Sequence, residues 1–399
     1  MNVLFLSIST AISDINNRGI YPDLLRYFAN QSHNVYIVCP FERRTKKDTW
    51  LSTSGNVNVL GVKTLNITKS NPVEKLLATL TIEKQFDSAI RNYLGNVKFD
   101  LILYTTPPIT FNSLIAKLKR KHKAKTYLML KDIFPQNAVD LGYIKKGLIF
   151  WYFRKKEKEL YRVSDTIGCM SPANVSFVLK HNPEISATKV SLCPNAIDVR
   201  NRKLTSGRET VFGKFNIPKD ACVFLYGGNL GVAQGIPFLI KLLEACKDRK
   251  DVFFVIVGSG NRSKLISDFI NKNKPQNAVY LPMLPRAEYE LFELSSDVGM
   301  VFLDGRFTIP NFPSRMLSYM EASLPLLVVS DLISDAGKIA EENCFGKWCE
   351  FGNLTGLLGL IDFFVCNVEK SSQMGKNGFN FLCENYSIEV PYNQIMSKV

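Results

Sequence analysis

The chain has 399 residues, of which 46% are hydrophobic and 22% charged, and its formal net charge is +14. This length allows roughly two to four domains of about 100–200 residues each. The composition is that of a globular protein, which excludes a disordered, collagen-like or disulfide-stapled chain. The longest apolar runs fall far short of the roughly 18–20 residues that span a bilayer.

Short apolar runs alternate with helix-like stretches through the first half of the chain. The expected strands are residues 2–9, 34–39, 99–104, 126–130 and 165–170, and the expected helices are 21–29 and 146–163. Apolar runs of this length, placed between helices, are typical of buried strands. The alternation predicts a parallel sheet that is covered by helices on both faces.

The same alternation restarts after a polar stretch at residues 195–219, which we interpret as an interdomain linker. The expected strands are 222–226, 251–257, 278–281, 298–303 and 326–329, and expected helices include 288–294 and 314–322. The sequence therefore predicts two doubly wound α/β domains, 1–200 and 201–383, with a final helix at about 384–399 that packs back on the first. In such sheets ligands bind beyond the carboxyl ends of the strands, so the turns there are the candidate sites.

Positive charge is concentrated in the first half. Residues 1–200 contain 29 basic and 15 acidic residues, a net charge of +14, whereas residues 201–399 contain 21 of each. Two dense basic clusters lie at 117–125 and 145–158, and the second surrounds the apolar run 148–153. This run belongs either to the core beneath a solvated helix face or to a surface that binds an anionic membrane. Nucleic acid is not expected as a partner, because the sequence contains no nucleic-acid-binding motif.

Nine cysteines are scattered along the sequence without a Cys-x-x-Cys pair. This arrangement fits a reducing compartment better than a disulfide framework or a zinc site. We therefore expect a cytoplasmic protein in which most cysteines are small core residues.

Two turns in the second half are rich in glycine and follow strands. The turn at 226–237 includes Gly228, Asn229 and Gln234, and the turn at 258–261 begins with Gly258. Glycine lets a ligand approach the backbone closely, and the free N–H groups of a following helix bind phosphate. A tight structural turn remains the alternative interpretation of both stretches.

A third turn, residues 308–322, combines a helix start with a cation. Ser314 is a candidate N-cap, and Arg315 would place a fixed positive charge beside the N-terminus of the helix. Together they favour a diphosphate site over a simple cap with a surface arginine.

Polar residues also follow two strands of the first half. Asp14, Asn17 and Arg18 come after the first strand, and Asp132 follows the strand at 126–130. The Asp132 carboxylate would accept hydrogen bonds from hydroxyl groups or act as a base, or else it would cap the next helix. The three histidines form no recognisable triad or metal-ligand spacing, so we expect no metal site.

In their order and spacing, these turns resemble the motifs of family 4 glycosyltransferases of the GT-B fold. The matching stretches are Pro194–Asp198, Gly228–Gly231, Gln234–Gly235, Val257–Gly260, Tyr280–Leu284 and Pro313–Arg315. Residues Lys131–Pro135 are similar to the Asp-Leu-Trp-Pro motif of amino-sugar transferases that build bacterial O-antigens and capsules. The resemblance covers almost the whole chain.

The resemblance implies the GT-B architecture, in which two Rossmann-like domains face a central cleft. It implies a retaining, metal-independent hexosyltransferase without a cofactor, which moves an N-acetylated or deoxy amino hexose from a UDP-sugar. The implied acceptor is a lipid diphosphate-linked saccharide of lipopolysaccharide or capsule synthesis. The basic first domain would bind this acceptor at the inner face of the cell membrane, so that the protein is peripherally associated.

The resemblance also assigns roles to individual residues. Asp132 and Arg315 are the implied catalytic residues, and the acceptor-binding residues are Asp14, Asn17 and Arg18. The donor-binding residues are Gly228, Asn229, Gln234, Gly258, Met283, Leu284, Asn311, Phe312, Ser314, Arg315, Met316 and Glu321.

Two positions depart from the family pattern. Gln234 stands where the family has a phosphate-neutralising lysine, and Ser318 stands where it has a ribose-binding glutamate. Glu321 lies three residues later, roughly one helical turn away. These departures leave two alternatives open. One is a catalytically degenerate GT-B scaffold that recruits a glycan-assembly complex to the membrane, and the other is a sugar-nucleotide epimerase of the same fold.

Overall fold

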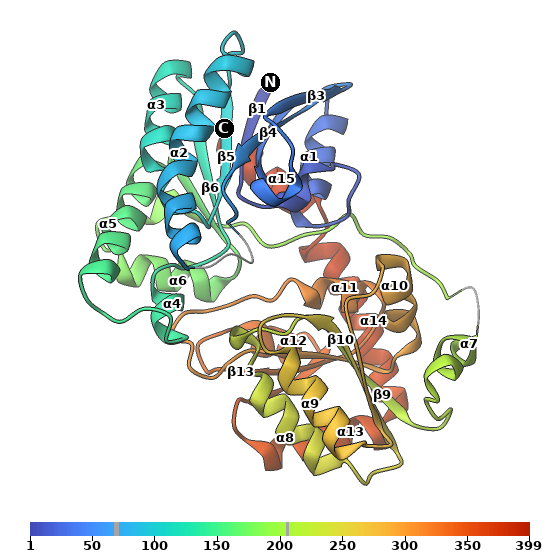
Figure 1. Ribbon diagram of the computed structural model, residues 1–399. Coiled ribbons are helices and arrows are strands. Elements are labelled where there is room, and N and C mark those ends of the chain that lie inside the picture. Colours follow the sequence, from blue (N-terminus) through green and yellow to red (C-terminus); the bar gives the residue numbers. More distant parts are fainter. Residues whose placement is uncertain (68–71, 205–206) are drawn as a thin grey trace. The chain divides into compact units, whose positions relative to one another are not determined.

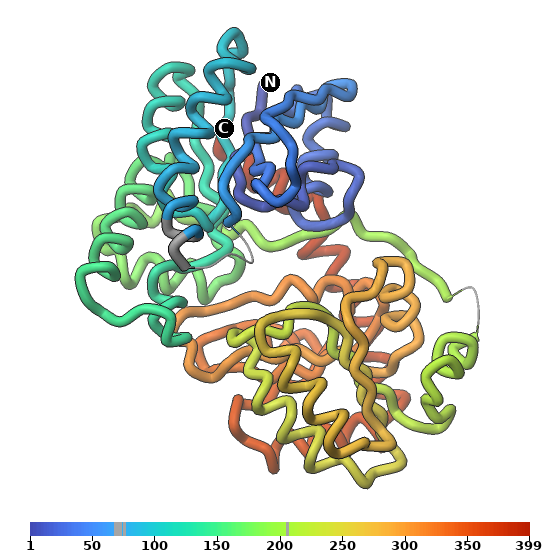
Figure 2. The backbone as a smooth tube through the Cα atoms, in the orientation of Figure 1, coloured from blue at the N-terminus to red at the C-terminus, as the bar shows by residue number. Residues whose placement is uncertain are grey.

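The computed structural model describes residues 1–67, 72–204 and 207–399, which form two compact units (Figure 1). Unit 1 comprises Met1–Asp198 and Ser387–Val399, and unit 2 comprises Val199–Tyr386. Both ends of the chain therefore belong to unit 1, as the tube in Figure 2 lets the reader follow. The junction falls two residues before the predicted one, and the returning segment begins three residues after the predicted residue 384.

Unit 1 is built on an eight-stranded sheet in the order β3-β4-β2-β1-β5-β6-β7-β8. Its strands are β1 (Asn2–Leu6), β2 (Asn34–Glu42), β3 (Trp50–Ser54), β4 (Val57–Thr64), β5 (Leu101–Thr105), β6 (Lys125–Leu130), β7 (Thr166–Cys169) and β8 (Val190–Leu192). Neighbouring strands are parallel except β3 and β4, which are antiparallel. All five residues of β5 are buried, because helices cover both faces of the sheet.

The helices of unit 1 lie on both sides of this sheet. They are η1 (Thr10–Ser13), α1 (Ile20–Asn30), η2 (Arg43–Thr45), α2 (Pro72–Leu94), α3 (Asn112–His122), α4 (Gln136–Asp140), α5 (Leu148–Val163), α6 (Pro172–His181), η3 (Ala187–Lys189) and α15 (Glu389–Met396). Figure 1 shows α2, α3 and α5 side by side on one face and α1 with α15 on the other. Phe28 of α1 and Ile395 of α15 pack in one buried cluster with Phe5 and Ile37 of the sheet.

The hairpin β3–β4 and helix α2 lie outside the elements expected from the sequence. Four of the five residues of β3 are exposed, so this strand carries no apolar run that would reveal it. Because β3 is antiparallel to β4, the expectation of a purely parallel sheet is wrong at this edge.

The stretch 195–219 is also more ordered than the predicted linker. It contains α7 (Arg208–Phe212) and η4 (Gly213–Phe215), while residues 205–206 lie outside the described part. Phe212 is buried, and Arg208 forms an ion pair with Asp297 at 3.0 Å. Only the beginning of this stretch therefore connects the units, and the rest is part of unit 2.

Unit 2 has a six-stranded sheet in the order β11-β10-β9-β12-β13-β14, and all neighbouring strands are parallel. The strands are β9 (Cys222–Asn229), β10 (Val252–Ser259), β11 (Ala278–Leu281), β12 (Val298–Phe302), β13 (Leu326–Ser330) and β14 (Gly346–Glu350). The other helices are η5 (Val232–Gln234), α8 (Ile236–Cys246), α9 (Ser263–Asn273), α10 (Arg286–Ser295), α11 (Arg315–Glu321), α12 (Ala336–Glu342), α13 (Leu354–Cys366) and α14 (Val368–Asn385).

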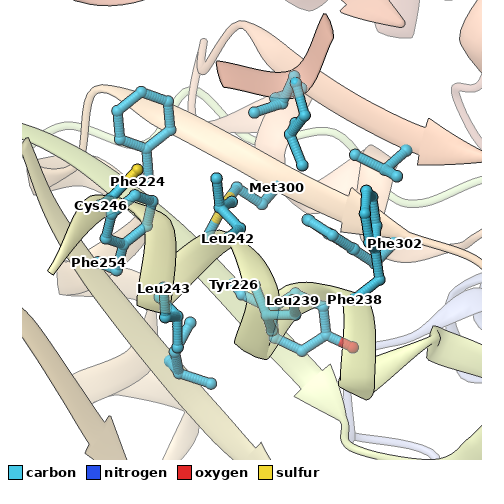
Figure 3. Packing of buried hydrophobic residues seen from close by; sticks show 14 of the residues in the cluster. Phe224, Tyr226, Phe238, Leu239, Leu242, Leu243, Cys246, Phe254, Met300 and Phe302 are labelled. Carbon is cyan, nitrogen blue, oxygen red and sulfur yellow. The ribbon is translucent and has the colours of Figure 1, made fainter. Parts of the chain in front are cut away.

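One face of this second sheet packs against α8. Figure 3 shows Phe224 and Tyr226 of β9 together with Leu242 of α8 and Phe302 of β12. The red atom in Figure 3 is the hydroxyl oxygen of Tyr226, which donates to the carbonyl oxygen of Asn229 at 2.9 Å. The apolar core therefore ends where β9 ends, and polar contacts begin there.

Candidate functional site

Arg315, the first residue of α11, has a guanidinium group that forms no ion pair with the part of the chain that the structure describes. Its Cζ atom lies 4.6 Å from the centroid of the Tyr226 ring, and its buried Nη1 atom has no hydrogen-bond partner among the described residues. A Cβ atom built on Gly228 would lie 3.6 Å from the same Cζ. A buried charge is costly unless it is paired. The arrangement therefore fits an anionic ligand at the end of β9.

The Gly-rich turn after β9 is closed by Gln234. Its Oε1 atom accepts hydrogen bonds from the backbone N–H of Gly231 at 3.2 Å and from Asn229 Nδ2 at 3.0 Å. A lysine has no acceptor and could not make either bond. The glutamine at this position thus shapes the turn, and Arg315 is the cation that approaches Gly228.

Gly258 is required by packing within the chain. It has φ +152°, and a Cβ atom there would lie 1.9 Å from the carbonyl oxygen of Gly228, which is its neighbour on β9. A side chain would therefore push the ends of β9 and β10 apart. Packing alone thus accounts for a glycine at 258, and its predicted donor contact stays a prediction; Gly228, with φ +118°, is exposed and lies beside Arg315.

Glu321 belongs to an internal ion-pair network. Its Oε2 atom lies 2.8 Å from Nε of Arg202, and its Oε1 atom accepts from the backbone N–H of Arg200 at 2.8 Å. Arg202 also pairs with Glu293 at 2.7 Å. Because the Glu321 side chain is 1% exposed and both oxygens have partners inside unit 2, the predicted donor contact of Glu321 is corrected.

The start of α11 also differs from the prediction. Ser314 occupies the N-cap position, but its side chain makes no capping hydrogen bond. Phe312 and Met316 are buried, and the Phe312 ring lies 5.4 Å from that of Tyr386. The side chains of Phe312 and Met316 therefore face the core of unit 2, so the prediction that these residues bind a donor concerns their backbone groups.

The other predicted donor-site residues lie in loops after strands. Asn311 is half-buried, and its backbone N–H donates to Ser334 Oγ at 3.0 Å. Met283 and Leu284 follow β11, with Met283 exposed and Leu284 half-buried. The structure gives no contact between these three residues and Arg315.

In unit 1, Asp132 lies just beyond β6. Its backbone N–H donates to Thr106 Oγ1 at 3.1 Å, and its Oδ1 atom accepts from Asn137 Nδ2 at 2.5 Å. Burial raises the pKa of Asp132 to about 6, although hydrogen bonds from Asn137 and from the Ile133 backbone to its carboxylate act to lower it. The N-cap of α4 is Pro135, so Asp132 does not cap that helix. A carboxylate that titrates near neutral pH is suited to binding or deprotonating a hydroxyl group.

Hydroxyl groups that sequence reasoning missed lie at the ends of the neighbouring strands. Thr105 Oγ1 donates to Ser7 Oγ at 3.1 Å, and Thr105 also hydrogen-bonds the Tyr21 side chain. Burial raises the pKa of Tyr21, and the Asp132 carboxylate raises it further. The only signal in the sequence is that Ser7 and Thr105 come where apolar runs end.

The predicted acceptor residues Asp14, Asn17 and Arg18 lie in one turn between β1 and α1. Asp14 Oδ1 accepts from the backbone N–H of Asn16 at 3.0 Å, and Arg26 Nη1 donates to the carbonyl oxygen of Asn17 at 2.7 Å. Arg18 Nη2 donates to the carbonyl oxygen of Asp198 at 2.7 Å. The turn is thus held to the rest of unit 1, while Asp14 and Asn17 are exposed.

The two basic clusters have different surroundings. On α3, Lys117 pairs with Asp87 at 2.7 Å and Lys119 pairs with Asp165 at 2.6 Å. Near α5 the apolar side chains are exposed instead, and Leu148 is 91% exposed. We define the α5 surface as Tyr143, Lys145, Lys146, Leu148, Ile149, Trp151, Tyr152 and Lys155, all of which are exposed. The interpretation that this run lies in the core is therefore wrong, although Phe150 is buried.

The described part of the chain comprises residues 1–67, 72–204 and 207–399. No helix in these ranges is long and apolar enough to cross a bilayer. The same ranges contain no group of three or more His, Cys, Asp or Glu side chains that could hold a metal ion.

Comparisons with known proteins agree with the division into two units. Residues 22–201 match Glycosyltransferase Family 4, and residues 207–381 match Glycosyl transferases group 1. The probable glycosyltransferase WbjE of Pseudomonas aeruginosa is 26% identical over 292 residues, which cover 72% of this chain and 71% of WbjE.

Solved structures share the fold at low identity. Sucrose-phosphate synthase from Thermosynechococcus elongatus has a TM-score of 0.79 at 14% identity, covering 100% of this chain and 98% of that one. Anabaena Alr3699/HepE in complex with UDP has a TM-score of 0.69 at 13% identity, covering 100% and 99%. These similarities show two Rossmann-like units of the GT-B architecture.

Proposed function

Because this chain is a GT-B glycosyltransferase, with a Glycosyltransferase Family 4 unit before a Glycosyl transferases group 1 unit, we propose that it transfers a sugar from a UDP-sugar to a lipid-linked saccharide. The sugar is an N-acetylated or deoxy amino hexose, and its anomeric configuration is retained. Neither a metal nor a further cofactor takes part. The similarity of Lys131–Pro135 to the O-antigen and capsule branch supports a role in bacterial surface polysaccharide synthesis.

The observation that carries the donor assignment is the unpaired guanidinium of Arg315. It lies beside Gly228 at the end of β9, where the backbone of a parallel α/β sheet is open to a ligand. A donor diphosphate would supply the missing negative charge. The bound UDP of Alr3699/HepE supports uridine as the nucleoside.

The proposed chemistry is electrostatic. As the bond between sugar and diphosphate breaks, negative charge grows on the diphosphate, and Arg315 stabilises that charge from a fixed position. The acceptor hydroxyl attacks from the face that the leaving group vacates, which gives retention. No covalent intermediate on the protein is needed for this step.

On the acceptor side, Asp132 binds the attacking hydroxyl and takes up its proton as the new glycosidic bond forms. At neutral pH its carboxylate is mostly ionised, because its pKa is about 6. Ser7, Tyr21 and Thr105 would support the wall of the site beside Asp132, because Ser7 and Thr105 are buried and hydrogen-bonded within unit 1. Asp14, Asn17 and Arg18 would contact the part of the acceptor that lies farther from Asp132.

The α5 surface supports a membrane-bound acceptor. Leu148 and Trp151 are exposed apolar side chains that can enter the headgroup region, and Lys145, Lys146 and Lys155 attract anionic lipids. These three lysines form no ion pair within the described residues, so their charges remain available. We therefore propose that the protein binds the inner face of the cell membrane peripherally through this surface.

The donor assignment is tested by thermal unfolding of the wild-type protein with UDP, GDP, ADP and TDP. A ligand at one hundred times its dissociation constant adds about 2.7 kcal/mol of stability. We expect UDP alone to raise the unfolding temperature of the wild-type protein, and to raise that of Arg315→Met less at the same concentration. If no nucleotide stabilises a folded wild-type sample, the scaffold alternative replaces the transferase.

The membrane assignment is tested by sedimentation with vesicles of phosphatidylcholine and phosphatidylglycerol. Burial of a leucine or tryptophan contributes about 1.5–3 kcal/mol, so Leu148→Ser with Trp151→Ser should weaken binding at least about tenfold. Val368→Ser, which changes a residue of unit 2 that is 70% exposed, is the matched control and should bind like the wild type. Equal binding of all three proteins would contradict the proposal.

A further inference from the structure

Three tyrosines surround the contact between Arg315 and β9. The Tyr226 ring lies below the guanidinium group, with 4.6 Å between its centroid and Cζ. Tyr319 lies four residues after Arg315 on α11, and its hydroxyl oxygen accepts from the backbone N–H of Gly227 at 2.8 Å. Tyr289 of α10 hydrogen-bonds Tyr319. The three side chains thus connect α11 and α10 to the end of β9.

The fit around Gly227 is close enough to fix these elements. A Cβ atom on Gly227 would lie 1.8 Å from the Tyr289 hydroxyl oxygen. Tyr319 is 0% exposed, so its hydroxyl is the partner that keeps the Gly227 N–H from being buried and unsatisfied. Loss of that hydroxyl would release α11 from β9 at the point where Arg315 and Gly228 meet.

The chemistry of this cluster is also suited to a ligand-binding cation. Phenol rings stabilise a guanidinium group through their faces, yet they leave its charge uncompensated. A carboxylate in the same place would neutralise Arg315 and repel a diphosphate. The tyrosines therefore hold the cation in position without competing for it.

We infer that Tyr319 and Tyr226 are positioning residues that set the place of Arg315 for the donor diphosphate, an inference that rests on the proposed function. Tyr319 fixes the helix that carries the arginine, and the Tyr226 ring supports the guanidinium group from below. Neither residue needs to touch the donor.

The test is a double-mutant cycle on UDP affinity, measured by calorimetry on the full-length protein. Tyr319→Phe removes the hydrogen bonds of its hydroxyl to the Gly227 N–H and to Tyr289, and we expect UDP to bind roughly three- to tenfold more weakly. Residues that act through one another give non-additive effects. In the Arg315→Met background, the Tyr319→Phe change should therefore have no further effect on UDP affinity.

Tyr226 is tested by a pair of variants. Tyr226→Phe keeps the ring below the guanidinium group but loses the hydroxyl that donates to the Asn229 carbonyl oxygen, so it should weaken UDP binding less than Tyr226→Leu, which loses the ring as well. Tyr104→Phe is the matched control, since it removes a buried phenol that bonds Ser164 Oγ at 2.6 Å in unit 1. We expect it to lower the unfolding temperature but to leave UDP affinity unchanged.

Two results would overturn the inference in distinguishable ways. If the wild type binds UDP but the effects of Tyr319→Phe and Arg315→Met simply add, the tyrosine acts independently and only this inference is wrong. If the folded wild type binds no UDP at all, the donor assignment fails, and the positioning role is rejected with it.

Discussion

Unit 2 holds two arginines whose guanidinium groups are largely shielded from water, and their surroundings are opposite. Arg202 lies between two carboxylates, 2.7 Å from Glu293 and 2.8 Å from Glu321. Arg315 lies against a tyrosine ring, and its buried Nη1 atom has no partner within the described residues. The same side chain thus serves stability in one place and is left ready for an anion in the other. The burial of an arginine therefore does not show whether it serves stability or binding; the groups that contact its guanidinium must also be known.

Helix α11 is connected to both arginines. Glu321 at the end of α11 binds Arg202, while Arg315 opens the same helix. The ion pairs of Arg202 therefore help to hold the helix that carries the proposed donor-binding cation.

The largest effect is expected from Arg202→Met. This change leaves Glu293 and Glu321 buried without their cation, and breaking a buried pair in this way costs about 3–5 kcal/mol. We expect the free energy of unfolding to fall by that amount in urea denaturation. The triple variant Arg202→Met, Glu293→Gln, Glu321→Gln is the control and should recover much of the loss. Undiminished stability of the single variant would show that the pairs of Arg202 contribute little.

Arg315→Met should lower the rate of sugar transfer strongly and change stability little, the reverse of what we expect for Arg202→Met. Loss of a fixed group that stabilises the leaving diphosphate lowers transfer about 10²- to 10³-fold, equivalent to about 2.7–4 kcal/mol. The free energy of unfolding should change by less than about 1 kcal/mol, because no internal ion pair is lost. Release of UDP from UDP-sugars and urea denaturation measure the two quantities. If Arg315→Met were strongly destabilised yet fully active, Arg315 would be a stabilising residue and its proposed role in transfer would be contradicted.

A pH profile extends the comparison to the carboxylate of unit 1. Burial raises the pKa of Asp132 from 3.8 to about 6, so its ionised form predominates only above that value. Activity should be about tenfold lower near pH 5 than on the plateau above pH 7. Asp132→Asn should be less active, and its activity should not fall further between pH 7 and pH 5.

Asp132 should affect stability in the opposite direction: activity should rise with pH, whereas the contribution of Asp132 to stability should fall. The folded state binds the Asp132 proton more tightly than the unfolded state, so its stabilising contribution is complete below about pH 4 and is lost as the pH rises through about 6. The unfolding temperature of Asp132→Asn, measured relative to the wild type, should therefore increase from pH 4 to pH 7. A constant difference would contradict the raised pKa.

The smallest effect is expected from Gln234→Lys, which restores a cation to the Gly-rich turn. The variant loses two hydrogen bonds accepted by Gln234 Oε1, so alone it should bind UDP no better than the wild type. In the Arg315→Met background the new lysine should improve UDP affinity several-fold, because it supplies the missing charge. Calorimetry measures both, with Gln234→Met as the neutral control. No recovery in the double variant would show that charge alone does not explain Arg315.

Local patterns in the sequence predicted most of the strands and selected Arg315 as a candidate anion-binding residue. The strand β9 and the turn after it appear as an apolar run followed by glycines, and Arg315 follows two prolines at a helix start. The role of Arg202 could not be predicted, because its partners Glu293 and Glu321 are about 90 and 120 residues away in the chain. The hydroxyl groups beside Asp132 and the tyrosines of β9 and α10 near Arg315 could not be predicted either, because they too are far in sequence from the residue they surround.

The errors have a common physical reason. Glu321 was predicted to bind the donor from its position in a motif, yet Arg202 and the Arg200 N–H occupy both of its oxygens. Phe312 and Met316 were predicted from the same motif, and the core of unit 2 contains their side chains, so that prediction concerns their backbone groups. A motif locates a backbone segment, but the direction and partners of each side chain are decided by tertiary packing.

The central claim is that the counter-ion of Arg315 is the diphosphate of the donor. Calorimetric titration of UDP and of uridine into the wild type and Arg315→Met tests it most directly. The account predicts that UDP binds the wild type more than about tenfold tighter than the variant, while uridine, which lacks the diphosphate, binds both equally. Equal affinity of UDP for the two proteins would contradict the claim.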